Sequence, residues 1–548
     1  MAASSKPTNE SSHPYDALPN HQDFDSMISD AKFTADTSTD IYDPGLTSRR
    51  SALVGVACSS IFSCSCIIAG IVTLANHGVL GVTAINLSVH NYDYSSLLPL
   101  QGEILALALN FIGTLCTESI GFVHGISLHS ALASESRLSF NTNLRLLTAA
   151  RGWYNPNGTL FNGISAVLLI MSYSSASLIV VVDTVISQTS QTSSAPKIVI
   201  AIAGTPLLAL GVALLLQVII ALSGMRAVKI LTWSSSPFDL TAALVHHTQL
   251  TPATLRCMRC VSDINTDEGP AKPLKIQPSA WHAHPSIRKV VIFLWVIVAA
   301  CAEWAALVMY IWHKYAPQGI MSPDALTPQT WSFIPNLLNG NFNYIGYSIP
   351  GVNFQVWILV IVNMAVVQGL LTLGLHCSEL IANVIRDEKQ WRCATRRKGL
   401  STATNPVKTI FTHPTCLVLF VAKPFLHWMF GYSFMIIDSA FDGKLEGVRV
   451  GMLTAQIWNL CIALFIFACF FTFVALHQPR GPQPAAYGHL QTLANLVDEW
   501  SPVMWWGHKE DGIPYCHAGT GDHPLPDVNM DRVYAGSGAG SLVYVPLS

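Results

Sequence analysis

Long apolar blocks alternate with polar segments along the whole of this chain. Eight blocks are long enough to cross the hydrocarbon core of a bilayer, which is about 30 Å thick and needs roughly 20 apolar residues. They lie near residues 51–75, 104–128, 161–182, 198–224, 290–312, 353–378, 416–438 and 450–476. The pattern predicts an all-α fold, a polytopic membrane helix bundle of about eight transmembrane helices.

Composition excludes a set of soluble domains. Of the 548 residues, 51% are hydrophobic and only 11% are charged, against about 25% charged residues in a typical soluble domain. The 30 basic and 32 acidic residues nearly cancel, so there is no electrostatic basis for binding nucleic acid. The 13 cysteines are scattered, many of them within apolar runs, and do not form a disulfide framework.

The basic residues indicate an orientation. If the N-terminus lies in the cytosol, 25 of the 30 Lys and Arg residues fall on the cytosolic side, four fall on the other side, and Lys423 lies within a span. Because cytosolic loops carry an excess of Lys and Arg, we expect both termini in the cytosol of a plasma-membrane or endomembrane protein. In this topology the sequon at Asn86 is a candidate glycosylation site in the first non-cytosolic loop.

The polar segments define three regions. Residues 1–50 are rich in Ser, Thr, Asp, Asn and Pro and are predicted to form a disordered cytosolic tail. Residues 51–478 form the bundle, with cytosolic loops at 129–160, 225–289 and 383–415. Residues 479–548 form a second cytosolic tail, in which leucines at helical spacing predict an amphipathic helix near 487–500, on the membrane or against the cytosolic loops. The rest of that tail is Gly- and Pro-rich and is expected to be irregular.

Loop lengths suggest an internal duplication. A long loop, a second long loop and a short loop separate the first four spans, and the last four spans follow the same order. Parallel repeats of this kind occur in transporters. The two halves show no residue-level identity, so duplication and coincidence both stay open.

Ionisable residues inside the predicted spans are the candidate functional residues. A charge at the centre of a span costs roughly 2.5–3.5 kcal/mol on insertion scales, so such residues face the interior, pair or stay neutral. Four of them are deep, namely Glu118, Glu303, Lys423 and His427. His124 lies on the polar face of the second span, and His376 and Glu379 lie on that of the sixth. We expect these two faces to meet, with His376 and Glu379 at the membrane interface.

The depths of the charged residues within their spans also predict that two of them are in contact. Counting residues from the cytosolic side places Lys423 and Glu118 at similar depths, so we expect them to approach each other. One interpretation is a structural ion pair, or a Glu kept neutral by burial. The other is a proton or ion relay through Glu118, Glu303 and His427.

Known catalytic and cofactor motifs are absent from the sequence. There is no HExxH, no GxSxG and no GxxxxGK[ST] motif. Cys257 and Cys260 resemble half a zinc site, but no second half follows at a suitable spacing. The group His508, Cys516, His517 and His523 has no standard spacing either, and a haem between His124 and His376 has little support. We therefore predict no catalytic residue, no metal and no cofactor.

Several stretches resemble a fungal family of multi-spanning integral membrane proteins that has no assigned activity. The stretches are Arg137–Arg145, Thr232–Asp239, His376–Glu379, Arg386–Glu388, Lys423–Gly431 and Tyr487–Trp500. They extend from the second span into the C-terminal tail, so the resemblance covers most of the chain. It implies the membrane topology and a fungal setting, and nothing about a substrate.

Three functions follow as hypotheses. The deep ionisable residues favour a transporter-like or channel-like protein for a small solute or ion, with the lipid bilayer as its surroundings. The large cytosolic segments favour a scaffold or accessory protein without transport. The third hypothesis is a membrane enzyme that acts on a lipophilic metabolite. The substrate and the oligomeric state do not follow from the sequence.

Overall fold

The computed structural model describes most of the chain between residues 42 and 536. These residues belong to one compact unit, Tyr42–Ser548. The predicted disordered tail lies almost entirely outside the described residues, and so does the sequon at Asn86. The described ranges are 42–77, 82–85, 94–142, 148–185, 197–263, 269–315, 344–350, 354–402, 406–441 and 444–536.

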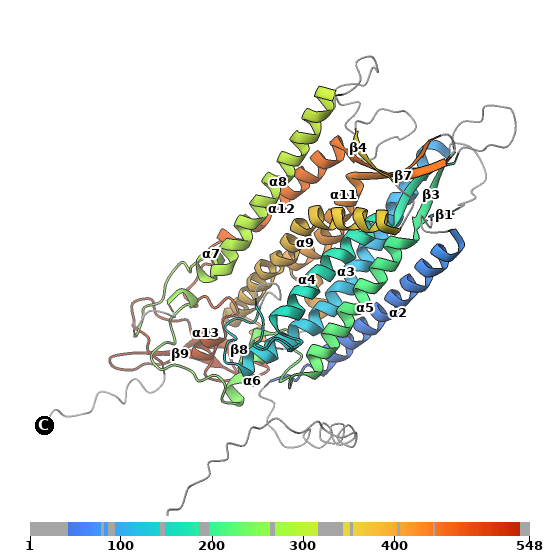
Figure 1. Cartoon of the computed structure of the whole chain (residues 1–548). Coiled ribbons are helices and arrows are strands. Elements are labelled where there is room, and N and C mark those ends of the chain that lie inside the picture. Colours follow the sequence, from blue (N-terminus) through green and yellow to red (C-terminus); the bar gives the residue numbers. More distant parts are fainter. Residues whose placement is uncertain are drawn as a thin grey trace, which may run out of the picture. The chain divides into compact units, whose positions relative to one another are not determined.

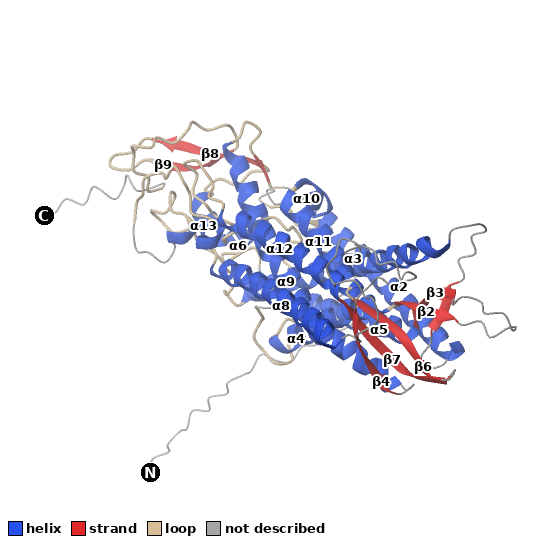
Figure 2. Ribbon diagram, turned by 90° about the horizontal axis from the view of Figure 1, so that it is seen from above, coloured by secondary structure: helices blue, strands red, loops and turns tan. Residues whose placement is uncertain are grey.

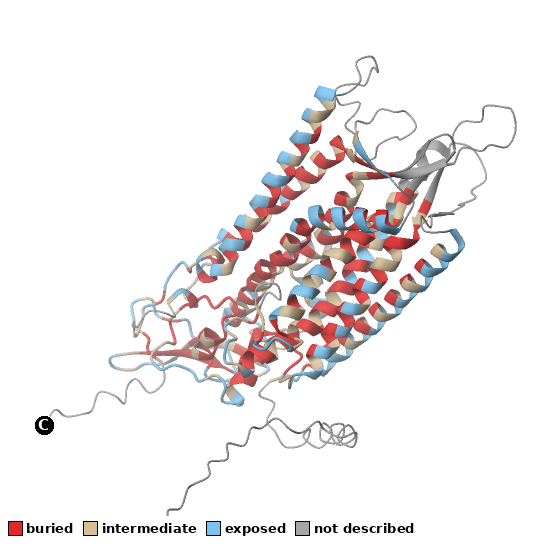
Figure 3. Cartoon of the chain, viewed as in Figure 1, coloured by how far each residue is buried: buried red, intermediate tan, exposed pale blue. Residues whose placement is uncertain are grey.

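Among the described residues, eight helices are long and apolar enough to cross a membrane, as predicted. They pack as a bundle (Figure 1), and exposed residues, pale blue in Figure 3, lie on its outer faces. Many large hydrophobic residues of these helices are among the exposed ones. This arrangement is that expected of a multi-pass membrane protein. The helices are α2 (Leu46–His77), α3 (Tyr94–Ser134), α4 (Thr159–Leu178), α5 (Gly204–Arg226), α8 (Pro285–Tyr315), α9 (Phe354–Trp391), α11 (Pro414–Tyr432) and α12 (Thr454–Leu476).

The prediction of a purely α-helical fold is wrong at one end of the bundle. Two antiparallel three-stranded sheets lie there, with the strand orders β1-β3-β2 and β4-β7-β6. Segments rich in β-branched residues, such as Val180–Val185, leave the helix because such side chains favour extended backbone. The strands are β1 (Val82–Ile85), β2 (Val180–Val185), β3 (Lys197–Ala203), β4 (Tyr344–Pro350), β6 (Phe434–Phe441) and β7 (Lys444–Leu453).

The two ends of the bundle are named by what they carry. The end with these six strands is called the hairpin end. The end at which α2 begins and residues 479–536 lie is called the tail end. Figure 1 shows β3 and β7 at the hairpin end and α13, β8 and β9 at the tail end.

The two halves of the bundle have the same topology. In both, one strand lies between the first and second long helices and a hairpin joins the third and fourth, which gives α2-β1-α3-α4-β2-β3-α5 and α8-β4-α9-α11-β6-β7-α12. The second half has three additional short elements between α9 and α11, namely η2 (Arg392–Thr395), β5 (Leu400–Ser401) and α10 (Pro406–Thr412). The registers also correspond, since Val180 pairs with Ile202 and Phe434 pairs with Met452. Each half has four spans, so the two run in the same direction. This shared topology supports the predicted duplication as a parallel repeat.

The halves meet through their central helices. α4 packs on α9 and α11 packs on α3, while β2 lies against β6. The outer pairs are α2 with α5 and α8 with α12. In the first pair the backbones approach closely, because a Cβ added at Gly211 would lie 2.8 Å from the carbonyl oxygen of Ser63. Figure 2 shows β4, β7 and β6 beside one another at the hairpin end.

The segments between the spans form an ordered layer at the tail end. It contains α6 (Pro237–His246), α7 (Ala280–Ala283), α10 (Pro406–Thr412), α13 (Leu490–Leu496) and a sheet of β5 (Leu400–Ser401), β8 (Val503–Glu510) and β9 (His517–Gly521). The predicted amphipathic helix is therefore present but shorter, and it packs on α6 rather than on a membrane surface. The prediction of an irregular C-terminal stretch is wrong for β8 and β9.

Buried charges at the end of α9 fasten this layer to the bundle. The Asn141 side-chain amide donates to Asp387 Oδ2 (2.9 Å), and the backbone N–H groups of Ala486 and Tyr487 both donate to Glu388 Oε2 (2.9 Å). Four of the stretches that carry the family resemblance meet at this junction. Because buried carboxylates need such partners, the C-terminal segment is part of the fold.

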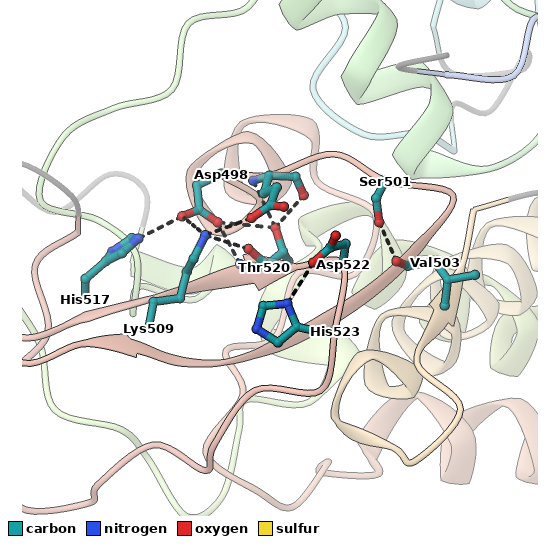
Figure 4. A network of polar contacts seen from close by, with 9 residues as sticks. Asp498, Ser501, Val503, Lys509, His517, Thr520, Asp522 and His523 are labelled. Carbon is teal, nitrogen blue, oxygen red and sulfur yellow. Dashed lines mark hydrogen bonds and ion pairs between the residues drawn. The ribbon is translucent and has the colours of Figure 1, made fainter. Parts of the chain in front are cut away.

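Asp498 organises the sheet of the tail layer (Figure 4). Its carboxylate accepts hydrogen bonds from the backbone N–H of Thr520 (2.7 Å), from His517 Nε2 (2.8 Å) and from Lys509 Nζ (3.1 Å). Burial by itself raises the pKa of Asp498, but the hydrogen bonds from His517, Thr520 and Lys509 outweigh burial and hold that pKa well below its usual range. The carboxylate thus stays charged wherever the layer is folded.

We predict that Asp498→Asn lowers the local free energy of unfolding of the tail layer by about 2 kcal/mol, because charge-assisted hydrogen bonds are lost. Hydrogen exchange of the β8–β9 amides at neutral pH measures this change. The matched control is Asp522→Asn, whose carboxylate is exposed and pairs only with the exposed His523. Equal effects of the two substitutions would contradict the assigned role of Asp498.

The stability that Asp498 contributes to the tail layer depends on pH, and the lowered pKa of Asp498 decides the direction of this dependence. Because the folded pKa of Asp498 is lowered, its contribution to stability is complete above about pH 3.9, the ordinary pKa of an unfolded Asp. The contribution is lost as the pH falls from there toward the folded pKa. Exchange protection of β8–β9 that changes between pH 7 and pH 5 in the parent, but not in Asp498→Asn, would contradict this assignment.

Candidate functional site

The centre of the candidate site is the buried ammonium group of Lys423. Lys423 lies on α11, and its side chain is only 2% exposed. Its Nζ contacts a carboxylate oxygen of Glu118 on α3 and of Glu379 on α9. The predicted contact between Lys423 and Glu118 is confirmed, and Glu379 is a second partner that was not predicted. The ammonium group therefore joins helices of both halves.

His376 extends this group along α9. Its Nδ1 lies 2.8 Å from Glu379 Oε1, one helical turn away. We call these four residues, Glu118, His376, Glu379 and Lys423, the carboxylate–lysine site. The side chains of Glu118 and Glu379 are 35% and 25% exposed. Both glutamate side chains therefore reach the surface in part, whereas the side chain of Lys423 does not.

His376 and Glu379 do not lie at the end of their helix, and their position at the membrane interface stays a prediction. The sixth apolar block ends at residue 378, but α9 continues to Trp391. Glu379 consequently lies twelve residues, about 18 Å, before the end of the helix. The end of an apolar run did not mark the end of the helix, because the tail layer covers the last turns of α9.

A stacked pair of rings lies beside the carboxylate–lysine site. The rings of Tyr173 and His427 are 3.7 Å apart between centroids and inclined by 11°. Tyr173 OH is 3.0 Å from Thr117 Oγ1, and His427 Nδ1 is 3.1 Å from Gln368 Nε2. The ring of His376 lies 5.8 Å from that of Tyr173, so the stack and the carboxylate–lysine site adjoin each other.

The stack also marks the relation between the two halves. Tyr173 lies seven residues before Val180, where β2 begins, and His427 lies seven residues before Phe434, where β6 begins. The two rings therefore occupy equivalent positions in the two repeats and meet where the repeats face each other. The position equivalent to Lys423, eleven residues before the strand, is Leu169 in the first half. The frame is thus duplicated, but the buried cation occurs in one copy only.

Three buried polar atoms in this region make no hydrogen bond within the described part of the chain. They are His376 Nε2, His427 Nε2 and Gln368 Oε1. A buried polar group without a partner is costly. These atoms are consequently available to water or to a small polar molecule that enters between the central helices.

The remaining predicted residues lie elsewhere. Glu303 does not join the cluster, because its side chain is exposed on the outer face of α8, while Cys301 and Ala305 are buried on the inner face. The expectation that Glu303 lies with the other deep charges is therefore wrong. His124 is buried in α3, six residues or about 9 Å from Glu118 toward the tail end.

Two contacts in this region were missed by reasoning from the sequence. Tyr173 was not singled out, although it is the one aromatic ring in the Ser-rich run 172–177 of an otherwise aliphatic span. Glu103 was also missed, and its carboxylate accepts a hydrogen bond from Trp428 Nε1 at 2.9 Å. Polar side chains within apolar spans, or directly next to them as for Glu103, were the signal that could have found both.

One group of donor atoms among the described residues is close enough to share a metal ion. It consists of Glu118, His376 and Glu379, whose ligand atoms lie within 4.8 Å of one another. The ammonium group of Lys423 contacts two of these three side chains. An ion held by all three side chains together would therefore have to displace Lys423, and we assign no resident metal to the site. The groups at 257–260 and 508–523 do not come together in this way in the described ranges.

Comparison of the chain with protein-family models, with curated proteins and with solved structures finds no match. Membership of the fungal membrane-protein family thus stays a prediction. The chemistry of the carboxylate–lysine site is the basis for a functional proposal.

We predict that Lys423→Met strongly impairs folding, because it leaves two carboxylates in the bundle without their cation, a change that costs about 3–5 kcal/mol at buried pairs. Adding Glu118→Gln restores folding in part, since Glu379 still lacks its cation, and adding Glu379→Gln restores it further. Yield and monodispersity in mild detergent measure this series.

Glu303→Gln is the control, because its carboxylate is exposed on α8 and should not affect the yield. If Lys423→Met were as monodisperse as the parent, the carboxylate–lysine site would not stabilise the bundle.

Proposed function

We propose that this protein is a transporter-like membrane protein for a small solute or ion, coupled through the carboxylate–lysine site. The observation that carries the proposal is the sharing of one buried ammonium group, Lys423, by Glu118 of the first half and Glu379 of the second. Parallel repeats with a polar site between them are typical of carriers that alternate between two conformations.

The charges of the site indicate what it binds. With both carboxylates ionised, Lys423 charged and His376 neutral, the group has a net charge of −1. An uncompensated charge in a low-dielectric interior is costly, so the site favours one additional proton or one monovalent cation. The partly exposed side chains of Glu118 and Glu379 are where that cation would arrive.

Cation binding would act on the contact between the halves. A proton or cation on Glu118 weakens the attraction of that carboxylate for Lys423, which lies in the other half. Because Lys423 joins helices of both halves, this weakening lowers the cost of separating them. The state of the site and the relative position of the repeats are thereby linked.

A carrier fits this region better than an open channel. The stacked rings of Tyr173 and His427 and the side chain of Lys423 are buried between the central helices of the two halves. A continuous pore at this place would require these three side chains to separate. The channel-like alternative is therefore the weaker form of the proposal.

The orientation and the scaffold alternative belong to the proposal as well. The excess of Lys and Arg places the tail end in the cytosol of a plasma-membrane or endomembrane protein.

A scaffold role is the second candidate, favoured by the ordered layer at the tail end. Deleting residues 481–548 does not test that role separately, since Ala486 and Tyr487 hydrogen-bond to Glu388 in α9.

The test uses the full chain reconstituted in liposomes that contain a trapped pH-sensitive dye. Pulses of acid, Na⁺ or K⁺ are applied outside, with a trapped Na⁺- or K⁺-sensitive dye replacing the pH dye for those two ions, and the rate of the internal change is compared with protein-free vesicles. We expect a protein-dependent flux that falls at least about 10-fold in Glu379→Gln, equivalent to about 1.4 kcal/mol in the barrier.

Glu303→Gln serves as the matched control, because it removes a carboxylate from a span without touching the site. The absence of protein-dependent flux for all three cations, with a monodisperse parent, would overturn the proposal. So would equal losses of flux in Glu379→Gln and Glu303→Gln.

A further inference from the structure

A cavity at the tail end lies outside the carboxylate–lysine site. It has a volume of about 520 Å³ and is lined by Ile276, His477, Gln478 and Arg480. Two segments form it by pairing their backbones, since Gln277 N donates to Pro479 O (2.9 Å) and Gly481 N donates to Lys275 O (3.0 Å). The backbone of the lining residues is therefore held independently of their side chains.

The position of this cavity relative to the apolar helix surface is well defined. α12 ends at Leu476, and His477 follows directly. On the last turn of α12, Phe473 is 72% exposed and Leu476 is 49% exposed. Nearby, Trp295 Nε1 donates to Thr472 Oγ1 at 3.0 Å, and Trp is enriched at membrane–water interfaces. The cavity thus lies where the apolar surface of the bundle ends, at the level of lipid headgroups.

The charge around the cavity has one sign. Arg480 and His477 line it, and Lys275 is exposed next to Ile276. Neither of the stretches that build it, 269–302 and 454–497, contains an Asp or Glu. The Arg480 guanidinium makes no ion pair or hydrogen bond with any residue that the structure describes. Arg480 and Lys275, which form no ion pair with a described residue, attract an anion at this level.

We propose that this cavity binds the phosphate-bearing headgroup of an anionic membrane phospholipid. The planar guanidinium of Arg480 suits two oxygens of one phosphate, and His477 adds a second donor. The acyl chains would lie along Phe473 and Leu476 on the outer face of α12. A free phosphate would satisfy the same donors but would leave these apolar side chains without a partner. The proposal is independent of the transport function.

The experiment uses the full chain, delipidated in mild detergent. Native mass spectrometry and the thermal unfolding midpoint measure binding of a short-chain phosphatidic acid, with phosphatidylcholine of the same chain length and inorganic phosphate as separate arms. We expect phosphatidic acid to bind at least about 10-fold more tightly than either. The double variant Arg480→Gln/His477→Gln should lose that preference, whereas Arg480→Lys should retain part of it.

Arg397→Gln is the matched control, because it removes an exposed Arg from another part of the tail end. It should leave the affinity for phosphatidic acid unchanged. Equal binding of inorganic phosphate would overturn the lipid assignment, and equal binding of phosphatidylcholine would remove the role of charge. An unchanged affinity in the monodisperse double variant would exclude this cavity as the site.

Discussion

The burial of a single ammonium group constrains the interior of this bundle more than any other described contact. Lys423 is nearly inaccessible, and an uncompensated charge at such a place would oppose folding by several kcal/mol. Glu118 and Glu379 remove most of this cost, but they come from different halves of the chain. The helices α3, α9 and α11 must therefore meet at one depth, and the packing of the two halves follows from that requirement.

Buried charges also need partners closer to the end of α9, where the helix enters the tail layer. Asp387 and Glu388 are buried near the tail end, where Arg386 and Arg392 form ion pairs with them and Asn141 and the C-terminal segment donate further hydrogen bonds. Glu379 and Asp387 are eight residues apart on one continuous helix, about 12 Å. The carboxylate–lysine site and the tail layer are consequently attached to the same rigid element. A displacement of α9 at either place would be transmitted to the other.

The topology that the two halves share accounts for the frame of the site but not for its chemistry. The shared topology and strand register bring Tyr173 and His427 together at equivalent positions, where one repeat faces the other. Lys423, in contrast, corresponds to Leu169, so the first repeat contributes a carboxylate and an aromatic ring but no cation. A site that holds one cation between two similar halves needs charges that differ between the halves, even though the backbone topology of the halves is the same.

The sequence by itself determined those features that depend on the free energy of transferring residues into a membrane. The eight spans, and the similar depths of Lys423 and Glu118, follow from run lengths and a rise of about 1.5 Å per residue. Tertiary structure alone decided which buried charges belong together. Glu303 and Glu118 carry the same predicted insertion cost, but Glu303 faces outward because α8 buries its other face. Glu379 became a partner of Lys423 because α9 and α11 pack on each other at that depth. The cost of burying a residue is a local quantity, whereas the direction in which its side chain points depends on the neighbouring helices.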